Sequence, residues 1–393
     1  MAEANGPAGQ DAPATEGPPG GAATEGPPGG AAEGARHESP VQPAQGERSM
    51  TAAGYGGGTA APSSRGQRMW AITHSRYGSA EVLRIRELDR PAIGDDEVLI
   101  QVRAAGLDRG TWHFMTGLPY AFRLACGLRA PRNPVLGLDT AGTVVATGAQ
   151  VTRFAAGDAV FGVSRGAFAE YAAAREGKLA AKPPNLTFEQ AAVLGVSGVT
   201  ALQGLRDAGR LKRGQHVLIT GASGGVGTFA VQIAKAMGAE VTGVCSTAKT
   251  GLVRSIGADH VLDYSRDDIT GGTRRYDLIL DLAGNTALAR LRRALTPTGT
   301  LVLAGGEHGG RWLGLGRQVR ALVLSPFVRQ RLKMMLSTQD RADLEELAGL
   351  AETGAVTPVI GEIYPLHRAS DAMRQLEGGN ARGKLAISIS RAA

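Results

Sequence analysis

The segment from Gln215 to Ser246 constrains the fold more than any other part of this 393-residue chain. An apolar run, His216 to Thr220, leads into the glycine-rich loop ASGGVG, and an amphipathic stretch from about Gly225 to Met237 follows. A second run of strand-forming residues covers Glu240 to Val244. A strand, a helix and a second strand in this order predict a βαβ unit, whose two strands lie parallel.

The loop matches most of a dinucleotide-binding fingerprint. Ala222 stands where the pattern G-x-G-x-x-G has its first glycine, and Gly224 and Gly227 hold the other two places. Glycines there let the backbone approach a diphosphate, which the amide groups and the dipole at the helix N-terminus would bind. The residues predicted to contact the cofactor are Ala222, Ser223, Gly224, Gly225, Val226 and Gly227. The alternative is a βαβ turn that holds no ligand.

The end of the second strand predicts which dinucleotide binds. A site for NAD usually has Asp or Glu there, about 20 residues after the first glycine, on the ribose 2′-hydroxyl. This chain has Cys245, Ser246 and Thr247, followed by Lys249 and Arg254. Ser246, Lys249 and Arg254 could bind a 2′-phosphate, which a carboxylate would repel, so we expect NADPH. Alternatively, Lys249 and Arg254 are solvated residues of the next helix.

Three further strands are predicted after this unit, at residues 260–264, 276–284 and 299–306, with helical segments between them. Strands that alternate with helices favour a doubly wound α/β fold with a parallel sheet. Cofactor and substrate should meet where the strand ends face the rest of the chain.

The chain before this region has a different pattern. From residue 69 to about 182, short β-branched runs are broken by Gly, Pro and Asp, which predicts a β-rich domain. The sequence KPPNL at 182–186 marks its end, because paired prolines stop both helices and strand ladders. A helix should follow, with Thr187 as N-cap and Gln190 near its third position. The segment 359–390 should return a strand, a helix and a strand to the β-rich domain.

Residues 1–67 lack the composition of a folded domain. The unit ATEGPPGGA occurs at residues 14–22 and again at 23–31, within a stretch rich in Gly, Ala, Pro and Glu. Such a stretch has too little apolar surface to offset the entropy lost on ordering, so we expect a disordered tail. The tail holds seven acids and three arginines, so the rest of the chain is more basic than the net charge of +7 indicates.

Several classes of protein are disfavoured. No apolar run approaches the roughly 20 residues that span a bilayer. The N-terminal segment resembles neither a secretory signal nor an arginine-rich transit peptide, so we expect a cytoplasmic protein. Two cysteines, Cys126 and Cys245, are too few for a disulfide framework or a cysteine-rich zinc lobe. The basic charge is not interleaved with aromatic residues, so no nucleic-acid partner is expected.

A set of motifs, taken together, identifies a family. They are VLGLDTAGTV (135–144), FAAGDAVFG (154–162), GAFAEYA (166–172), GVTALQGL (198–205), the loop ASGGVG (222–227) and SIGADHVLDY (255–264). With them, residues 69–390 resemble the medium-chain dehydrogenase/reductase superfamily, in its zinc-free quinone oxidoreductase branch. The resemblance implies a GroES-like domain at 68–190, a Rossmann domain for NADPH at 191–330 and a return to the first domain at 331–393. We also expect a homodimer.

The metal ligands of the superfamily are missing. Zinc-dependent members carry a Cys after an AAG turn and a His-Glu pair in a later glycine segment. This chain has Leu-Asp-Arg at 107–109 and Gly-Leu-Asp at 137–139, so no metal is expected. Simple alcohol oxidation then lacks its Lewis acid.

The resemblance instead implies hydride transfer from NADPH to a quinone or an α,β-unsaturated carbonyl, in which hydrogen bonds can stabilise the charge on oxygen. Two alternatives remain. One is a zinc-free alcohol or aldehyde oxidoreductase that uses NADP, and the other is a non-catalytic regulatory protein that binds NADPH.

Candidates to line the substrate pocket come from residues 106–120. They are Asp108, Trp112, His113 and Tyr120. Relatives often have Asn-Pro where this chain has Asp108-Arg109. Trp112 and Tyr120 could instead be core aromatics. His113 could be a hydrogen-bonded loop residue and Asp108 a turn cap.

The resemblance also points to Thr200, Tyr264, Lys178 and Gly198. Thr200 matches the threonine that relatives place beside the nicotinamide, and Tyr264 lies where the branch commonly contacts the cofactor near the adenosine phosphate. Thr200 and Tyr264 could equally be packing residues of a helix and a strand.

The segment 310–337 does not fit the family pattern easily. It combines six cations with apolar residues such as Trp312, Leu322 and Phe327, and Pro326 should divide it into two helices. We expect this pair to cover the substrate cleft or a dimer contact. The alternative is a membrane surface, where lipophilic quinones reside.

Overall fold

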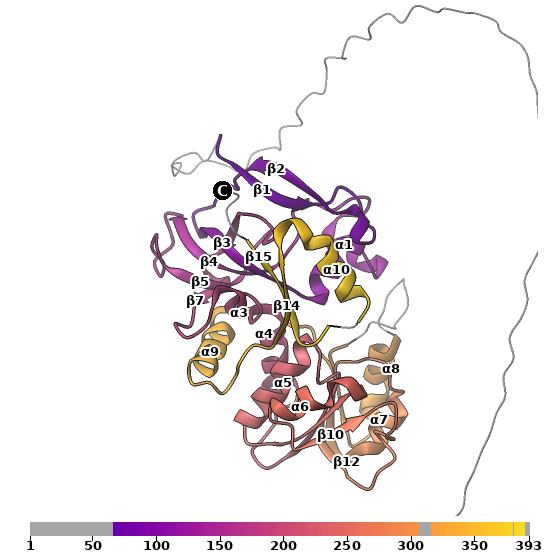
Figure 1. The fold of residues 1–393 in the computed structure, drawn as a ribbon. Helices are drawn as coiled ribbons and strands as arrows, with labels where there is room; N and C mark the ends of the chain where they lie inside the picture. Colours follow the sequence, from indigo (N-terminus) through magenta and orange to yellow (C-terminus); the bar gives the residue numbers. More distant parts are fainter. Residues whose placement is uncertain (1–65, 306–315, 380, 390–393) are drawn as a thin grey trace, which may run out of the picture. The chain divides into compact units, whose positions relative to one another are not determined.

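The computed structural model describes residues 66–305, 316–379 and 381–389. The predicted tail, 1–67, therefore lies almost wholly outside the described residues. The described chain has a β-rich part and an α/β part, as predicted (Figure 1). Among the described helices, none has the length and apolar character that a membrane span requires.

The β-rich part contains a seven-stranded sheet in the order β14-β15-β3-β4-β5-β7, with β6 beside β3. β3 (Glu97–Leu107) is nearly continuous in apolar residues because both of its faces are buried. It pairs antiparallel with β4, β6 and β15. The other strands of the sheet are β4 (Asp139–Thr147), β5 (Ala159–Val163), β6 (Tyr171–Arg175), β7 (Leu179–Ala181), β14 (Ile360–Pro365) and β15 (Lys384–Ser388).

Smaller elements complete this part. β1 (Arg68–Thr73) and β2 (Arg84–Asp89) form an antiparallel pair. The helices α1 (Arg109–Thr116) and α2 (Arg123–Cys126) follow β3, and α10 (Ala369–Glu377) lies between β14 and β15 in sequence. The predicted return of a strand, a helix and a strand to the β-rich sheet is confirmed.

Two helices connect the parts where one was predicted. α3 (Phe188–Ala192) begins with the predicted capping box, in which Thr187 and Gln190 exchange side-chain to backbone hydrogen bonds. The chain then breaks and restarts as α4 (Gly195–Gln203). The break allows the Val196 amide to donate to Asp139 Oδ1 at 2.6 Å. A Cβ on Gly195 would lie 2.6 Å from the same oxygen, so this approach requires glycine.

The α/β part is a six-stranded parallel sheet in the order β10-β9-β8-β11-β12-β13. Its strands are β8 (His216–Thr220), β9 (Glu240–Cys245), β10 (His260–Asp263), β11 (Tyr276–Asp281), β12 (Leu295–Leu303) and β13 (Arg331–Met334). Its helices are α5 (Gly225–Ala236), α6 (Thr250–Ser255), α7 (Leu288–Ala294) and α8 (Gly316–Leu324). The strand order reverses direction between β8 and β11, which is where such folds bind ligands.

Helices cover both faces of this sheet. Val217 and Ile219 of β8 pack in one buried cluster with residues of α5 and α6. Leu218, between them, packs in another with residues of α7 and α8. Successive side chains of a strand point to opposite faces, so a strand buried on both sides is apolar at every position. The predicted doubly wound fold is confirmed.

The prediction of two helices around Pro326 is wrong in its second half. α8 ends at Leu324 before the proline, but the residues after it form the strand β13, which pairs with β12. Leu332 is buried while Arg331 and Lys333 are exposed, which is the period of two that a strand at the edge of a sheet needs. The parallel sheet therefore extends to Met334, past the domain boundary predicted at residue 330.

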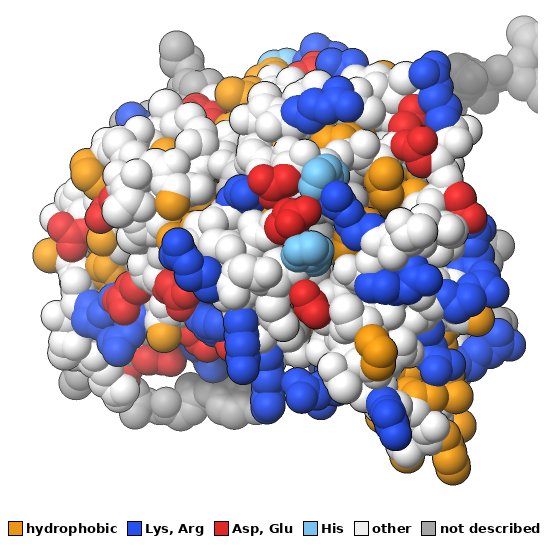
Figure 2. All heavy atoms as spheres, turned by 90° about the horizontal axis from the view of Figure 1, so that it is seen from below, with side chains coloured by type: hydrophobic (Ala, Val, Ile, Leu, Met, Phe, Trp, Pro, Cys, Tyr) orange, Lys and Arg blue, Asp and Glu red, His pale blue; other side chains and the backbone are white. Residues whose placement is uncertain are grey.

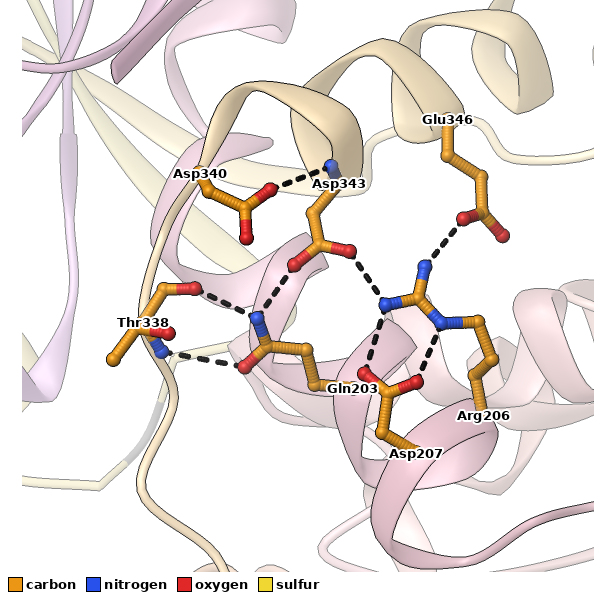
Figure 3. Close-up of polar contacts among 7 residues, drawn as sticks. All are labelled: Gln203, Arg206, Asp207, Thr338, Asp340, Asp343 and Glu346. Carbon is orange, nitrogen blue, oxygen red and sulfur yellow. Dashed lines mark hydrogen bonds and ion pairs between the residues drawn. The ribbon is translucent and has the colours of Figure 1, made fainter. Parts of the chain in front are cut away.

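Another helix, α9 (Arg341–Glu352), is joined to the end of α4 by a polar network (Figure 3). The Arg206 guanidinium contacts Asp207, Asp343 and Glu346, and Nη2 lies 2.6 Å from Asp343 Oδ1. Gln203 donates to Asp343 Oδ2 at 2.5 Å and to the Thr338 carbonyl at 2.7 Å. Hydrogen bonds with these carboxylates raise the pKa of Arg206, so it remains a cation.

Candidate active site

A cleft of about 1490 Å³ lies at the carboxyl ends of the parallel strands. Both parts of the chain line it. The α/β part contributes the glycine loop and the ends of β9, β11 and β12, and the remainder contributes α1, α4 and the start of β15. A smaller hollow of about 500 Å³, lined by Arg254, His260 and Tyr276, lies beside β10 away from the glycine loop.

The glycine loop presents backbone to the cleft. Ser223, Gly224, Gly225, Val226 and Gly227 line it, whereas Ala222 is buried behind them and donates its amide to Val244. Gly224 is the N-cap of α5 and provides no side-chain cap, so the first amides of α5 remain available to an anion. A Cβ on Gly227 would lie 2.1 Å from the Gly221 carbonyl oxygen, so only glycine fits there.

The residues predicted to lie near the phosphate of the adenosine line two different cavities. Ser246, Lys249 and Tyr264 line the cleft beside the end of β9, and Tyr264 is exposed. Arg254 lines the smaller hollow and not the cleft. Lys249 donates to the Ala381 carbonyl at 2.8 Å.

Sequence reasoning missed Arg382. Burial lowers the pKa of Lys249, and the positive charge of Arg382 lowers it further. Two cations at the end of β9 repel one another, and an anion bound there would relieve the repulsion. Arg382 is 133 positions from Lys249, counted along the printed chain, so no local pattern could reveal the pair.

No carboxylate of β9 lies at the site predicted for the 2′-phosphate. Glu240, the first residue of the strand, contacts the Nε2 atoms of His216 and His260 at 3.0 and 2.8 Å. These residues begin β9, β8 and β10, at the amino end of the sheet. Figure 2 shows histidine and acidic side chains side by side near the centre of this lower face, with Lys and Arg side chains spread around them. Glu240 thus lies a strand length from the cleft.

The four candidates for the substrate pocket have different positions. Asp108, Trp112 and His113 line the cleft, whereas Tyr120 is outside its lining and stacks against Arg123. The Asp108 carboxylate accepts hydrogen bonds from the Thr111 amide and hydroxyl, so it caps α1.

The Trp112 and His113 rings of α1 also contact other parts of the chain. Trp112 Nε1 donates to Glu377 of α10 at 3.0 Å, and His113 Nδ1 lies 2.5 Å from the Leu118 carbonyl oxygen. Their ring centroids are 5.0 Å apart. These contacts fix the orientation of both rings at the cleft wall.

The residues to which the family resemblance pointed also differ in their position relative to the cleft. Thr200 lines the cleft and donates its hydroxyl to the Val196 carbonyl at 2.7 Å. Gly198 is not in the lining and packs against Leu347 of α9. Lys178 donates to the Gln339 carbonyl, outside the cleft lining, so the structure does not support a cofactor contact for it.

Sequence reasoning also missed Lys384, a buried charged residue beside the cleft. Lys384 Nζ lies 2.9 Å from Ser197 Oγ and 3.4 Å from Asp139 Oδ2. Burial raises the pKa of Asp139, the nearby Lys384 opposes this increase, and the carboxylate of Asp108 adds to it. A lysine in the otherwise apolar run KLAIS is the one sequence signal that could have indicated a buried partner.

The described residues contain no group of three or more His, Cys, Asp and Glu side chains that could hold a metal ion. Asp108 stands at the first ligand position of the zinc-dependent enzymes and is occupied as a helix cap. That the protein holds no zinc stays a prediction.

Known families match both parts of the chain. The alcohol dehydrogenase GroES-like domain matches residues 94–185, and the zinc-binding dehydrogenase family matches residues 256–387. The quinone-oxidoreductase homolog of Spinacia oleracea chloroplasts is 31% identical over 334 residues, which are 81% of this chain and 98% of that protein. The chain belongs to the medium-chain dehydrogenase/reductase superfamily. Within the superfamily it is an oxidoreductase of the quinone oxidoreductase-like branch.

Two further members of the superfamily bear on the site. The 2-methylene-furan-3-one reductase of Solanum lycopersicum is 31% identical over 338 residues, which are 81% of this chain and 79% of that protein. A mycobacterial protein whose structure was solved with NADPH is 28% identical and superposes with a TM-score of 0.71. That match covers 81% of this chain and 99% of the mycobacterial one.

Proposed function

We propose that this protein transfers hydride from NADPH to a quinone or an α,β-unsaturated carbonyl compound. The observation that carries the proposal is a dinucleotide-type glycine loop and a basic strand end, with Lys249 near Arg382, at one cleft. The Spinacia relative is named for quinones. The name of the Solanum enzyme describes a substrate whose C=C bond is conjugated to a ketone.

The residues present fit NADPH at two places. The uncapped amides at the start of α5 suit the diphosphate. Ser246 and Lys249 suit the 2′-phosphate, where NADH would leave two neighbouring cations unpaired. The mycobacterial structure with NADPH supports the assignment of the cofactor.

The chain's own residues would position the substrate. When bound, the nicotinamide supplies the hydride. Leu107, Trp112 and Phe122 give one wall of the cleft an apolar and aromatic character, which suits a planar conjugated molecule. The contact of Trp112 with Glu377 fixes this wall before the substrate arrives, so little orientation entropy is lost during the reaction.

A turnover panel tests the proposal. The full chain is given NADPH or NADH with quinones, enones and aldehydes, and oxidation of the cofactor is followed. We expect turnover of quinones or enones with NADPH. Turnover limited to aldehydes and alcohols would support the zinc-free alcohol or aldehyde oxidoreductase. NADPH binding without any turnover would support the regulatory protein.

We also propose a homodimer formed through α8 and β13. The stretch from 319 to 336 holds several of the most exposed large apolar side chains, which are Val319, Leu322, Val323, Phe327, Met334 and Leu336. Within the described residues β13 is the last strand of its sheet, so its outer edge can pair with a second copy.

Light scattering of the parent chain and of Leu322→Glu tests the dimer. We expect the parent to have twice the chain mass and the variant to shift toward one chain. A monomeric parent that binds anionic vesicles would favour the membrane surface instead. The cytoplasmic location stays a prediction, since the Spinacia relative is named as chloroplastic.

A further inference from the structure

The two ends of the cleft lie at different strands of the parallel sheet. β9 lies on one side of β8, and β11, β12 and β13 follow on the other side. Lys249, after the carboxyl end of β9, and Met334, the last residue of β13, both line the cleft. Four strand spacings separate β9 from β13, or about 19 Å at the usual spacing of roughly 4.8 Å. A dinucleotide with its adenosine phosphate at Lys249 extends across the glycine loop, which leaves the β13 end to the substrate.

The lining at the β13 end is apolar. Met334, Met335 and Leu336 follow one another there, and the β-rich part adds Leu118 and Phe122 to the lining. Methionine has an unbranched and flexible side chain, so it adapts to ligands of different shape. Met334 and Leu336 offer no strong hydrogen-bonding group, so the ligand group that contacts them should be apolar as well.

Two of these side chains reach the outer surface. Met334 is 48% exposed and Leu336 is 79% exposed, although both line the cleft. Met335, between them, packs against the core, with Sδ 3.3 Å from the place that a Cβ on Gly204 would occupy. A single exposed leucine on a protein surface is ordinary, but apolar side chains that also line a ligand cleft indicate a contact. The apolar lining therefore continues from inside the cleft to its mouth.

This rim differs from the rest of the exposed apolar stretch. Val319, Leu322, Val323 and Phe327 are exposed but lie outside the cleft lining. They remain available for the proposed dimer contact. Met334 and Leu336 have a position that a dimer contact does not require, because they border the ligand cleft.

The length of the apolar lining limits the shape of the ligand group. A compact ring held inside the cleft would leave Met334 and Leu336 in water. A hydrocarbon chain attached to that ring could extend along them, and burial of apolar surface is favourable in proportion to its area. The cleft, at about 1490 Å³, exceeds the roughly 300–1,000 Å³ of a usual ligand site, as expected where a cofactor and a second extended ligand bind together.

We propose that Met334, Met335 and Leu336 bind a hydrocarbon chain of the substrate, so that the preferred substrates are quinones or enones that carry a long alkyl or alkenyl chain. The inference rests on the proposed function, because it requires a conjugated carbonyl compound in this cleft. It adds the class of substituent and the residues that contact it.

A series of 2-alkyl-1,4-benzoquinones tests the chain contact. The full chain is given NADPH with the methyl, propyl, pentyl and heptyl compounds, and kcat and KM are measured for each. We expect KM to fall by about two- to fourfold for each added CH₂ until the chain passes Leu336, as for a methylene group that leaves water. The kcat should change little, because the chain makes the same contact in the ground state and the transition state.

Variants test the residues. Leu336→Ser should raise KM for the heptyl compound about tenfold more than for the methyl compound, because only the longer chain reaches this position. Met334→Thr, which keeps a strand-forming residue in β13, should act in the same direction. Leu128→Ser is the matched control, because Leu128 is 68% exposed and lies outside the cleft lining. It should keep the chain-length dependence of the parent.

The outcomes separate this inference from the function on which it rests. A parent whose KM does not depend on chain length would show that the chain site is wrong, while quinone reduction stands. The same holds if Leu128→Ser reduces the dependence as much as Leu336→Ser does, or if neither Leu336→Ser nor Met334→Thr reduces it. A parent that reduces no quinone and no enone would show that the proposed function and the chain site are both wrong.

Discussion

In the proposed function, the choice between NADPH and NADH depends on Lys249. It sits at the rim of the cleft with its pKa lowered by burial and by Arg382, and its ammonium group donates to the Ala381 carbonyl. A 2′-phosphate beside Lys249 would offset the repulsion between this lysine and Arg382. Ser246, which lines the cleft at the end of β9, is neutral, so it brings no negative charge of its own to this place.

Replacing Lys249 by Ala should remove one charge-assisted hydrogen bond, worth about 1.5–3 kcal/mol, or roughly ten- to a hundredfold in NADPH affinity. The affinity for NADH should not change, because NADH lacks the phosphate. Titration of both cofactors measures this, with Lys212→Ala, an exposed lysine, as the control for net charge. Equal losses for NADPH and NADH would show that Lys249 supports the fold instead.

Asp139 and Lys384 give a second prediction, on stability. Lys384→Met should lower the free energy of unfolding by about 3–5 kcal/mol near pH 8, above the value of about 7 to which burial raises the pKa of Asp139, because it leaves the Asp139 carboxylate buried without its cation. The double variant with Asp139→Asn should recover most of this loss. Chemical unfolding of the parent and both variants measures the difference.

The loss should depend on pH in a defined direction. Burial raises the pKa of Asp139 above the unfolded value of about 3.9, and removing Lys384 raises it further. An acid with a raised pKa stabilises the fold at low pH, and this contribution is lost as pH rises through the raised value. Lys384→Met should therefore be closest to the parent near pH 4 to 5 and furthest from it near pH 8. A difference that is constant with pH would argue against an unpaired carboxylate.

At the scale of elements, α9 is held by contacts with α4, a helix that is distant from it in sequence but adjacent in space. Its first turn presents Asp343 to Gln203, the last residue of α4, and to Arg206 in the turn that follows (Figure 3). The Asp343 side chain is only 5% exposed, so it needs these partners to offset its lost hydration. The same helix packs Leu347 against Gly198, and so supports α4 behind the cleft.

Arg206→Met should destabilise the protein by about 1–3 kcal/mol, because Asp343 loses its cation. Arg206→Lys should recover only part of the loss, since an ammonium group cannot bridge three carboxylates as a planar guanidinium does. Thermal and chemical unfolding measure both variants. Arg213→Met, at an exposed position that forms no ion pair within the described residues, should have no effect. Equal stability of Arg206→Met and the parent would mean that the network contributes little.

At the scale of the whole molecule, the cleft is assembled by segments that are distant in sequence. Its lining begins at Leu107 and ends at Leu385, and includes residues of both domains. Apart from Gly66 and Gln67, the predicted tail lies outside the described residues. The tail's own composition also cannot form a wall of a packed site.

Removal of residues 1–65 should therefore leave turnover and cofactor affinity unchanged. The truncated and full chains are compared in the same NADPH assay, with circular dichroism to confirm that both fold. A truncated chain that folds but does not turn over would reveal a role for the tail in the reaction.

The sequence by itself determined the elements whose signals are local. The capping box of Thr187 and Gln190 spans three residues, and the glycine loop is a continuous run between a strand and a helix. The alternation of strands and helices likewise predicted the parallel sheet. These features depend on backbone conformation and on neighbours within a few residues, which a sequence displays directly.

Only the tertiary structure decided β13 and the composition of the site. The residues after Pro326 form a strand because the exposed edge of β12 offers backbone hydrogen bonds, which outweigh their helical pattern. Lys384 meets Ser197 across 187 positions and Asp139 across 245. Such contacts are fixed by how the chain returns from the α/β sheet to the β-rich sheet. A buried charge is stable only where that return provides its partner, and no local pattern contains this information.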